Sequence, residues 1–416
     1  MNSLTDSITD SKKDSYTINS MTGDVVERSF LDTMQESNII RMTDSDDLYG
    51  LQQFCYEKCD KFDSDKVKRS RGIVFSGETL VMEAFPYTEE IRKNDIVNFS
   101  SKINLSDSKF YYSYEGMLIR MFFYQDKWFV TTHRKLDAFK SKWSSRVSFG
   151  EMFINCLEKE YRTNPEFTNF INEKTSGDSG ILDRFKSVLD KTRQYMFLVL
   201  NEGENRIVCI NDKTGPSVLH VGTFDSTTRK QVDDNVYVRK PTALDNVYSS
   251  LEEVYEHSQT VDYTKYQGII IFTPDNKQYK VLNNEYEYFY SIRGNEPSIK
   301  FRYLQIRSNE EYNRILRQMY PEMCSTFDMY ENYIRNIAKD IFNAYVERFM
   351  KKNFTTVSQD EYVIIKACHG WHLKDRKKNI VSLKRVFEEI NNVQPSLINK
   401  MIRTRIQKER KLAFQG

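Results

Sequence analysis

Residues 114–123 read YEGMLIRMFF and residues 128–132 read WFVTT, with a polar turn between them at 124–127. Both flanking runs are rich in the β-branched and aromatic residues that are typical of strands. Two strands joined by so short a connection form an antiparallel hairpin, because a parallel pair needs a long crossover. This stretch therefore favours antiparallel sheets over a parallel α/β fold.

Similar runs recur between residues 49 and 307, interrupted by a few helical patterns. The expected strands lie at 72–75, 117–123, 128–132, 195–200, 206–210, 268–273 and 278–282. Apolar residues at helical spacing predict helices at 150–161 and 182–191. Basic and apolar residues alternate from Lys300 to Leu304, which predicts a half-buried strand with one basic face.

After about residue 308 the apolar period becomes helical. One face of a long helix is formed by Phe327, Tyr330, Ile334, Ile337, Ile341, Tyr345 and Phe349. Ser358, Ser382 and Ser396 stand where helix N-caps belong. The predicted fold class is α+β, with antiparallel sheets and flanking helices followed by an all-α C-terminal domain. The expected domains are an acidic, mostly disordered tail at 1–47, an α+β domain at 48–307 and a basic helical domain at 308–416.

Charge is distributed unevenly along the 416 residues, although the net charge is only +2. Residues 1–50 hold 4 Lys/Arg and 10 Asp/Glu, giving −6, whereas residues 301–416 hold 22 and 13, giving +9. This asymmetry predicts an acidic tail and a basic binding module. No apolar run approaches the roughly 18 residues of a membrane span, and no leader is recognisable, so we expect a cytoplasmic protein without membrane contact.

Common catalytic and metal-binding motifs do not identify a function for this sequence. The chain has no GxGxxG and no GxxxxGK[ST] phosphate loop. The pairs Cys55/Cys59 and Cys368/His372 fit no common zinc spacing and fall in different predicted domains, so we predict no metal site. Six cysteines without framework spacing suit a reducing compartment.

An ordered set of segments carries a resemblance to a known family. It comprises RGIVF at 71–75, YEGMLI at 114–119, NRIV at 205–208, Gln267-Gly268 and then Lys280, 13 residues after Gln267. In this order the segments resemble the phage tRNA-repair type of RNA ligase, in the covalent nucleotidyltransferase superfamily with DNA ligases and mRNA capping enzymes. The resemblance covers about residues 49–410 and implies a nucleotidyltransferase-like fold. In the C-terminal part it rests on helical architecture alone.

The resemblance implies a particular chemistry. In the family, the lysine of K-x-D-G attacks ATP and forms a lysyl–AMP phosphoramidate, which requires an uncharged amine. Carboxylates of the F-E-F and E-G motifs hold the nucleotide sugar and a divalent metal. The paired lysines of K-x-K neutralise phosphate charge in the transition state.

Most of the polar positions implied by the family are changed in this sequence. Ser113 stands in place of the nucleophilic lysine, and serine carries no amine. The other replaced positions are Tyr87, His133, Leu198, Gln267 and Leu282, where the family has lysines or carboxylates. Arg71, Glu115 and Lys280 are retained. Because the changes affect groups that serve one reaction, they indicate a degenerate nucleotide pocket.

Basic residues beside aromatic ones are candidates for binding a phosphate-rich single strand. The candidates are Arg134, Lys135, Lys142, Arg146, Arg293, Lys377, Lys378, Arg403 and Arg405. For each cluster, an ordinary solvated face is the competing interpretation.

Three functions remain open from the sequence. The first is a catalytically inactive RNA ligase-like protein that binds RNA or a protein partner, either in a complex or in a virion. The second is an ATP-dependent RNA ligase with a rearranged active site, which would use ATP and Mg²⁺, whereas the first needs no cofactor. The third is a purely structural assembly component. The loss of the motifs together with the acidic tail suggests a viral protein of the cytoplasm, a viral factory or a virion.

Overall fold

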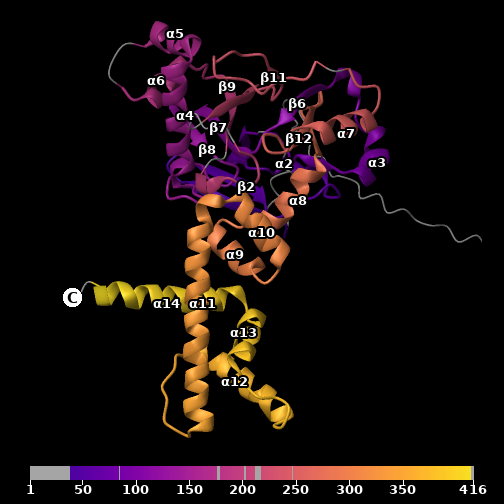
Figure 1. Ribbon diagram of the computed structural model, residues 1–416. Helices are drawn as coiled ribbons and strands as arrows, with labels where there is room; N and C mark the ends of the chain where they lie inside the picture. The colour runs from indigo at the N-terminus through magenta and orange to yellow at the C-terminus, as the bar shows by residue number, and fades with distance from the viewer. Residues whose placement is uncertain are drawn as a thin grey trace, which may run out of the picture. The chain divides into compact units, whose positions relative to one another are not determined.

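The computed structural model describes residues 38–83, 85–175, 179–200, 203–210, 217–245 and 247–413 (Figure 1). Internal contacts divide the chain into two units, Met1–Tyr286 and Glu287–Gly416. Each unit has hydrophobic cores of its own. Most of the predicted tail, residues 1–37, lies outside the described residues, as does part of the predicted loop at 175–180.

The described residues of the first unit form three sheets. The first has the order β1-β2-β3-β4, from β1 (Ile40–Asp46), β2 (Leu51–Tyr56), β3 (Ile73–Ser76) and β4 (Thr79–Met82). The second has the order β11-β10-β9-β7-β8, from β11 (Gln231–Val232), β10 (Val218–Asp225), β9 (Arg193–Leu200), β7 (Gly116–Tyr124) and β8 (Lys127–Thr131). The third has the order β5-β13-β12-β6, from β5 (Glu89–Ile91), β13 (Gln278–Leu282), β12 (Gly268–Phe272) and β6 (Lys109–Ser113). The strand pairs within these sheets are antiparallel except β5 with β13.

Helices cover one face of two of these sheets. The five-stranded sheet packs against α4 (Phe149–Thr163), α5 (Pro165–Lys174) and α6 (Ile181–Val188), which lie together in Figure 1. The sheet that contains β6 packs against α3 (Ile96–Ser100) and α7 (Leu251–Thr260). The remaining short helices are α2 (Asp65–Arg69), η1 (Lys93–Asp95), η2 (Leu105–Asp107), η3 (Ala138–Lys140) and η4 (Gly203–Asn205).

The opposite sheet faces share a further core. Successive strand residues point to opposite faces, so Ile119 packs toward α4 while Phe122 packs toward the other sheets. That core joins Val74 of the first sheet, Phe122 and Met196 of the second, and Phe272 of the third. The faces that carry Ser113 and Leu198 therefore belong to the interior between sheets, where the site described below is formed.

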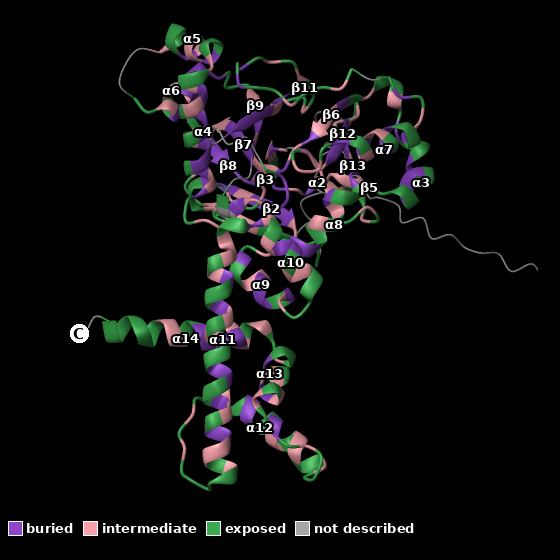
Figure 2. Ribbon diagram, in the orientation of Figure 1, coloured by how far each residue is buried: buried purple, intermediate pink, exposed green. Residues whose placement is uncertain are grey.

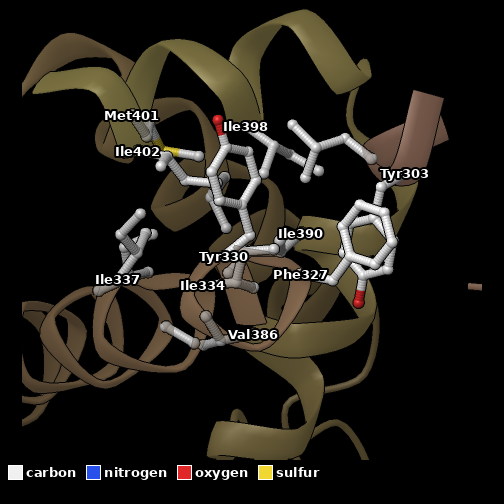
Figure 3. Packing of buried hydrophobic residues seen from close by; sticks show 14 of the residues in the cluster. Tyr303, Phe327, Tyr330, Ile334, Ile337, Val386, Ile390, Ile398, Met401 and Ile402 are labelled. Atoms are coloured by element: carbon white, nitrogen blue, oxygen red, sulfur yellow. The ribbon is translucent and has the colours of Figure 1, made fainter. Parts of the chain in front are cut away.

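The second unit is helical. Its helices are α8 (Asn284–Arg293, which begins in the first unit), α9 (Ile299–Ile306), α10 (Glu310–Met319), η5 (Pro321–Met323), α11 (Cys324–Tyr345), η6 (Val346–Met350), α12 (Gln359–Lys374), α13 (Leu383–Asn392) and α14 (Pro395–Ala413). Buried and exposed residues alternate along α11 in Figure 2, as the three- and four-residue spacing predicted. Figure 3 shows Ile334 and Ile337 of α11 in one core with Ile390 of α13 and Ile402 of α14.

The predicted fold class is confirmed: the chain is α+β, with antiparallel sheets, flanking helices and a helical C-terminal region. Short turns predict hairpins at 124–127, 201–204 and 273–276, and two of them are present, β7 with β8 and β12 with β13. The hairpin of 195–200 with 206–210 is wrong, because residues 206–210 form no strand. Ser358 and Ser382 are N-caps as predicted, whereas Ser396 lies inside α14, which begins at Pro395.

Three segment predictions are wrong. Residues 40–46 were assigned to the tail but form β1, which pairs with β2. Residues 206–210 form a loop and not a strand. The predicted basic strand from Lys300 is α9, capped by Ser298, because alternation over a short run does not separate a strand from a helix. The boundary between the α+β and helical parts was predicted after Arg307. The helices α8 and α9 belong mainly to the second unit, so the chain divides after Tyr286.

Candidate functional site

Ser113 lies at the end of β6, where a continuous hydrogen-bonded chain of side chains begins, all buried except the half-buried Gln267. Its hydroxyl donates to Gln267 Oε1 at 3.1 Å, and Gln267 Nε2 donates to the Tyr286 hydroxyl at 2.7 Å. The Tyr286 hydroxyl in turn donates to Glu115 Oε2 at 3.2 Å. We call these four residues the buried polar chain. It contains one carboxyl group and no amine, so it has no nitrogen nucleophile.

Glu115 directs its carboxylate at main-chain amides. It accepts hydrogen bonds from the amides of Ile207 (2.8 Å), Val208 (3.0 Å) and Cys209 (3.3 Å). Successive N–H groups around one anion form a binding concavity for it, and bonds to an ionised acceptor are strong. This contact explains why residues 206–210 do not form the predicted strand: several of their amides are bound to a side chain.

Lys280 occupies the same sheet face as Ser113. Ser113 pairs with Gly268 and Gly268 with Leu282, while Lys280 pairs with Ile270 two residues away. From β6 across β12 to β13 there are two strand spacings of about 4.8 Å, and along the strand there is an offset of two residues of about 3.3 Å each. The Cα atoms of Ser113 and Lys280 are therefore ~12 Å apart. Desolvation lowers the pKa of Lys280, and the nearby Arg71 lowers it further against the opposing charges of Glu90 and Glu115.

His133 and Arg71 complete a cationic region with Lys280. Burial lowers the pKa of His133 to about 3, and the charges of Arg71, Arg120 and Arg134 act in the same direction. The guanidinium of Arg71 donates to Pro86 O at 3.1 Å and to Thr88 Oγ1 at 3.3 Å. We call Arg71, His133 and Lys280 the cationic region, although its histidine is neutral at pH 7.

Arg120 holds the backbone on which Arg71 and His133 stand. It is fully buried, and its guanidinium donates to the main-chain oxygens of Gly72 and Thr132, the neighbours of Arg71 and His133. Burial lowers the pKa of Arg120 to about 9. Gly72 has φ +73°, and a Cβ there would lie 2.7 Å from His133 Cα. The backbones at positions 72 and 133 therefore approach too closely for any residue other than glycine at position 72.

The three remaining pocket predictions concern Leu198, Leu282 and Tyr87. Leu198 lies beside Gly116, the first residue of β7, where an added Cβ would lie 2.9 Å from Leu198 Cγ. Leu282 is buried opposite Gly268. Tyr87 instead lines a pocket of about 170 Å³ with Lys68 and Gln278, among others. Burial raises the pKa of Tyr87 to about 12.

Four of the candidate nucleic-acid-binding residues lie in the connection between β8 and α4. Lys142 and Arg146 are exposed in the segment that we call the basic loop, residues 140–147. Arg134 is also exposed and donates to the main-chain oxygens of Tyr56 and Glu57. Lys135 forms an ion pair with Asp44 at 3.5 Å. The loop ends at Ser148, which forms a capping box with Glu151 at the start of α4.

The candidates in the second unit divide into two groups. Lys377, Lys378 and Arg403 are exposed. Arg293 is fully buried and bonds the Tyr320 hydroxyl, so its assignment as a nucleic-acid contact is wrong. Arg405 is half-buried between the carboxylates of Asp340 and Glu361, which occupy its guanidinium, and this assignment is corrected as well.

Two residues of the site were missed in the sequence. Tyr286 lies in an aromatic run, EYEYFY, that gives no sign of a long-range hydrogen bond. Arg120 could have been found, because a lone charge inside the apolar run 117–123 must be buried with partners or mark a site. Within the described ranges, no group of three or more His, Cys, Asp or Glu side chains could hold a metal ion. None of the described helices has the length and apolar character needed to cross a membrane.

Similar proteins were found among viral sequences. No family model matches the chain. The chain is 28% identical over 368 residues to the immediate-early protein ICP-46 homolog of Invertebrate iridescent virus 6, covering 81% of this chain and 77% of that protein. It is 28% identical over 356 residues to the homolog of Invertebrate iridescent virus 3, covering 82% and 74%. The ICP-46 protein of Frog virus 3 is 27% identical over 57% of this chain and 58% of its own length.

The structural neighbours include ATP-dependent ligases. An RNA ligase of Naegleria gruberi solved with pyrophosphate matches 50% of this chain and 58% of its own, with a TM-score of 0.33 and 12% identity. A protein described as an ATP-dependent DNA ligase from Aquifex aeolicus matches 82% and 87%, with a TM-score of 0.36 and 14% identity. TM-scores of this size do not establish a common fold.

Proposed function

We propose that this chain is a catalytically inactive relative of the RNA ligases that acts by binding single-stranded RNA. The observation that carries the proposal is the buried polar chain. The residue at the position of the nucleophile is Ser113, and its hydroxyl is already bound to Gln267. A serine has no amine with which to form the phosphoramidate of the ligase reaction.

The cationic groups supply the binding activity. Arg71 and Lys280 place basic side chains in the pocket, while Lys142 and Arg146 present theirs on the exposed basic loop. Trp143 lies between these two cations in the sequence, and aromatic rings beside basic groups favour stacking of unpaired bases. A flexible single strand suits this surface better than a duplex, because stacking requires bases that are not already paired.

Adenylation provides the first test. Purified protein is incubated with α-labelled ATP and Mg²⁺ or Mn²⁺, then separated on a denaturing gel. We expect no labelled band from the wild-type protein and none from the Ser113→Ala variant. A labelled band that survives denaturation would overturn the catalytic part of the proposal, and peptide mapping would identify the nucleophile.

RNA binding at increasing salt provides the second test. Log affinity falls with log salt by about 0.7 for each phosphate neutralised on a single strand. We expect the double variant Lys142→Gln/Arg146→Gln to bind more weakly at low salt, with a slope shallower by about 1.4. The matched control is Lys102→Gln, an exposed lysine after α3, which should leave the slope unchanged. Wild-type affinity that is insensitive to salt would exclude phosphate recognition.

The viral relatives suggest a setting for this activity. They carry the name of an immediate-early protein, and the chain spans about three quarters of the two iridescent-virus homologs. This supports a role early in infection of a host cell. A protein complex or a virion is the competing partner, and its signature would be stable co-purification with no effect of the Lys142 and Arg146 substitutions.

A second candidate function is a ligase with a rearranged nucleophile, favoured by Lys280. Its lowered pKa increases the fraction of neutral amine, and it shares the sheet face of Ser113. In this reaction the amine would attack the α-phosphorus of ATP, form an N–P bond, lose a proton and release pyrophosphate. Labelling that is present in the wild type and absent in Lys280→Met would support it.

A further inference from the structure

The segment 205–210 is held at three points along its length. Its middle is bound by Glu115 through the amides of residues 207–209. Its end is bound through the Ile210 amide, which donates to Thr264 O at 2.6 Å. Its beginning is Asn205, whose side chain is 2% exposed and points away from Glu115's contacts toward another loop.

Asn205 connects this segment to the basic loop. Its side-chain oxygen accepts hydrogen bonds from the amides of Ser144 (3.1 Å) and Ser145 (3.2 Å), which lie between Lys142 and Arg146. Its Nδ2 contacts Met152 Sδ of α4 at 3.2 Å. The backbone that carries the two cations is therefore tied to residue 205, two residues from the first amide that Glu115 binds.

We propose that Glu115 is a positioning residue for RNA binding, which it controls by holding segment 205–210 and, through Asn205, the basic loop. The inference rests on the proposed RNA-binding function. The proposal explains why Glu115 is present although Ser113 stands where the resemblance places the motif's lysine. A loop held in one conformation loses less conformational entropy on binding, so its affinity is higher than that of a free loop.

The chemistry of the carboxylate explains why a close substitute should fail. An ionised carboxylate accepts at both oxygens, and Glu115 uses Oε1 for Ile207 and Oε2 for Val208, Cys209 and Tyr286. Glutamine has nearly the same shape but replaces one acceptor with an NH₂ donor. In Glu115→Gln at least one buried group therefore loses its acceptor, and the segment loosens.

Hydrogen exchange tests the connection without RNA. We expect the amides of Ser144 and Ser145 to exchange at least about tenfold faster in Glu115→Gln, since tenfold corresponds to one lost bond of ~1.4 kcal/mol. The matched control is Glu253→Gln, which changes a carboxylate that accepts from the Ser249 amide at the start of α7, outside the site, and should leave these two amides unchanged. Unchanged exchange in a folded Glu115→Gln variant would overturn the proposal.

RNA binding then tests the consequence. Glu115→Gln should weaken binding about tenfold at low salt, but it should have little further effect in the Lys142→Gln/Arg146→Gln background, because the groups it positions are gone. An equal loss in both backgrounds would contradict the proposal, since it would show that Glu115 acts elsewhere. If the wild type shows no salt-dependent binding, the proposed function fails, while hydrogen exchange still decides the connection.

Substitutions of Asn205 keep the test valid if Glu115→Gln does not fold. Asn205→Ala removes the acceptor of the Ser144 and Ser145 amides, so it should reproduce the faster exchange and the weaker RNA binding. Asn205→Asp retains an acceptor oxygen at the same place and should remain close to wild type in both measurements. Equal behaviour of the two variants would overturn the role of Asn205 as the connection.

Discussion

The two ends of the candidate site differ in what they have kept. At one end Ser113, Gln267 and Tyr286 form neutral hydrogen bonds in the buried polar chain. At the other end lie the basic side chains of Arg71 and Lys280, beside a His133 whose pKa is lowered to about 3. The first end has a serine at the position where the ligase resemblance places a nucleophilic lysine, whereas the second end keeps basic side chains. Under the proposed function, binding persists without catalysis, because attraction needs only charge while reaction needs an activated nucleophile.

Replacing Gly72 should disturb the cationic end most. Gly72→Ala places a Cβ at φ +73°, within 3 Å of His133 backbone atoms, and neither the strain nor the clash can be relieved by a side chain. We expect a loss of about 2–5 kcal/mol in the free energy of unfolding, measured by urea denaturation. Gly77→Ala is the matched control, because its φ is +55° but its Cβ meets nothing within 4 Å. Equal losses in the two variants would show that the approach of His133 is unimportant.

Acid should reveal the neutral state of His133. Its pKa is lowered to about 3 in the folded protein against 6.5 for an ordinary histidine, so the unfolded state binds more protons between these pH values. Folding stability therefore falls as pH falls from 6.5 toward 3. His133→Gln should remove about 2 kcal/mol of this fall, after allowance for solvent screening of a half-buried ring. Parallel stability curves for wild type and variant would contradict the lowered pKa.

The buried polar chain can be tested at Tyr286, a residue that no sequence pattern predicts there. Tyr286→Phe removes the hydroxyl that accepts from Gln267 and donates to Glu115, leaving two buried groups without that partner. We expect a loss of about 1–2 kcal/mol in thermal or urea unfolding. Tyr288→Phe removes a more exposed hydroxyl bound to Glu311 and should cost less than about 0.5 kcal/mol.

Lys280 should show the smallest change, with the opposite sign. Because its folded pKa is lowered from 10.5, desolvation penalises the charged form below that folded pKa, and stability rises as pH increases through it toward 10.5. Lys280→Met should raise the free energy of unfolding at neutral pH by about 1 kcal/mol and remove this alkaline rise. A destabilised variant would mean that the attraction of Glu90 and Glu115 exceeds the desolvation cost.

Much of the fold follows from local patterns. The turn at 124–127 joins β7 to β8 as predicted, and the spacing from Phe327 onward produces α11. The errors fall where a short segment has partners far away in sequence. Residues 206–210 have the composition of a strand, but their amides bind Glu115, and residues from Lys300 alternate like a strand yet pack as α9 in a helical core.

The sequence by itself determined which groups stand at these positions: Ser113 has no amine in any fold, and Gln267 and Leu198 carry no charge. Tertiary structure alone decided which partners the buried polar groups meet. Glu115 and Tyr286 are 171 residues apart, and Asn205 meets Ser144 across 61 residues. Such contacts depend on how β6, β12 and the 205–210 segment come together, and local periodicity reports only which face of an element is buried, not which distant hydroxyl or amide it meets.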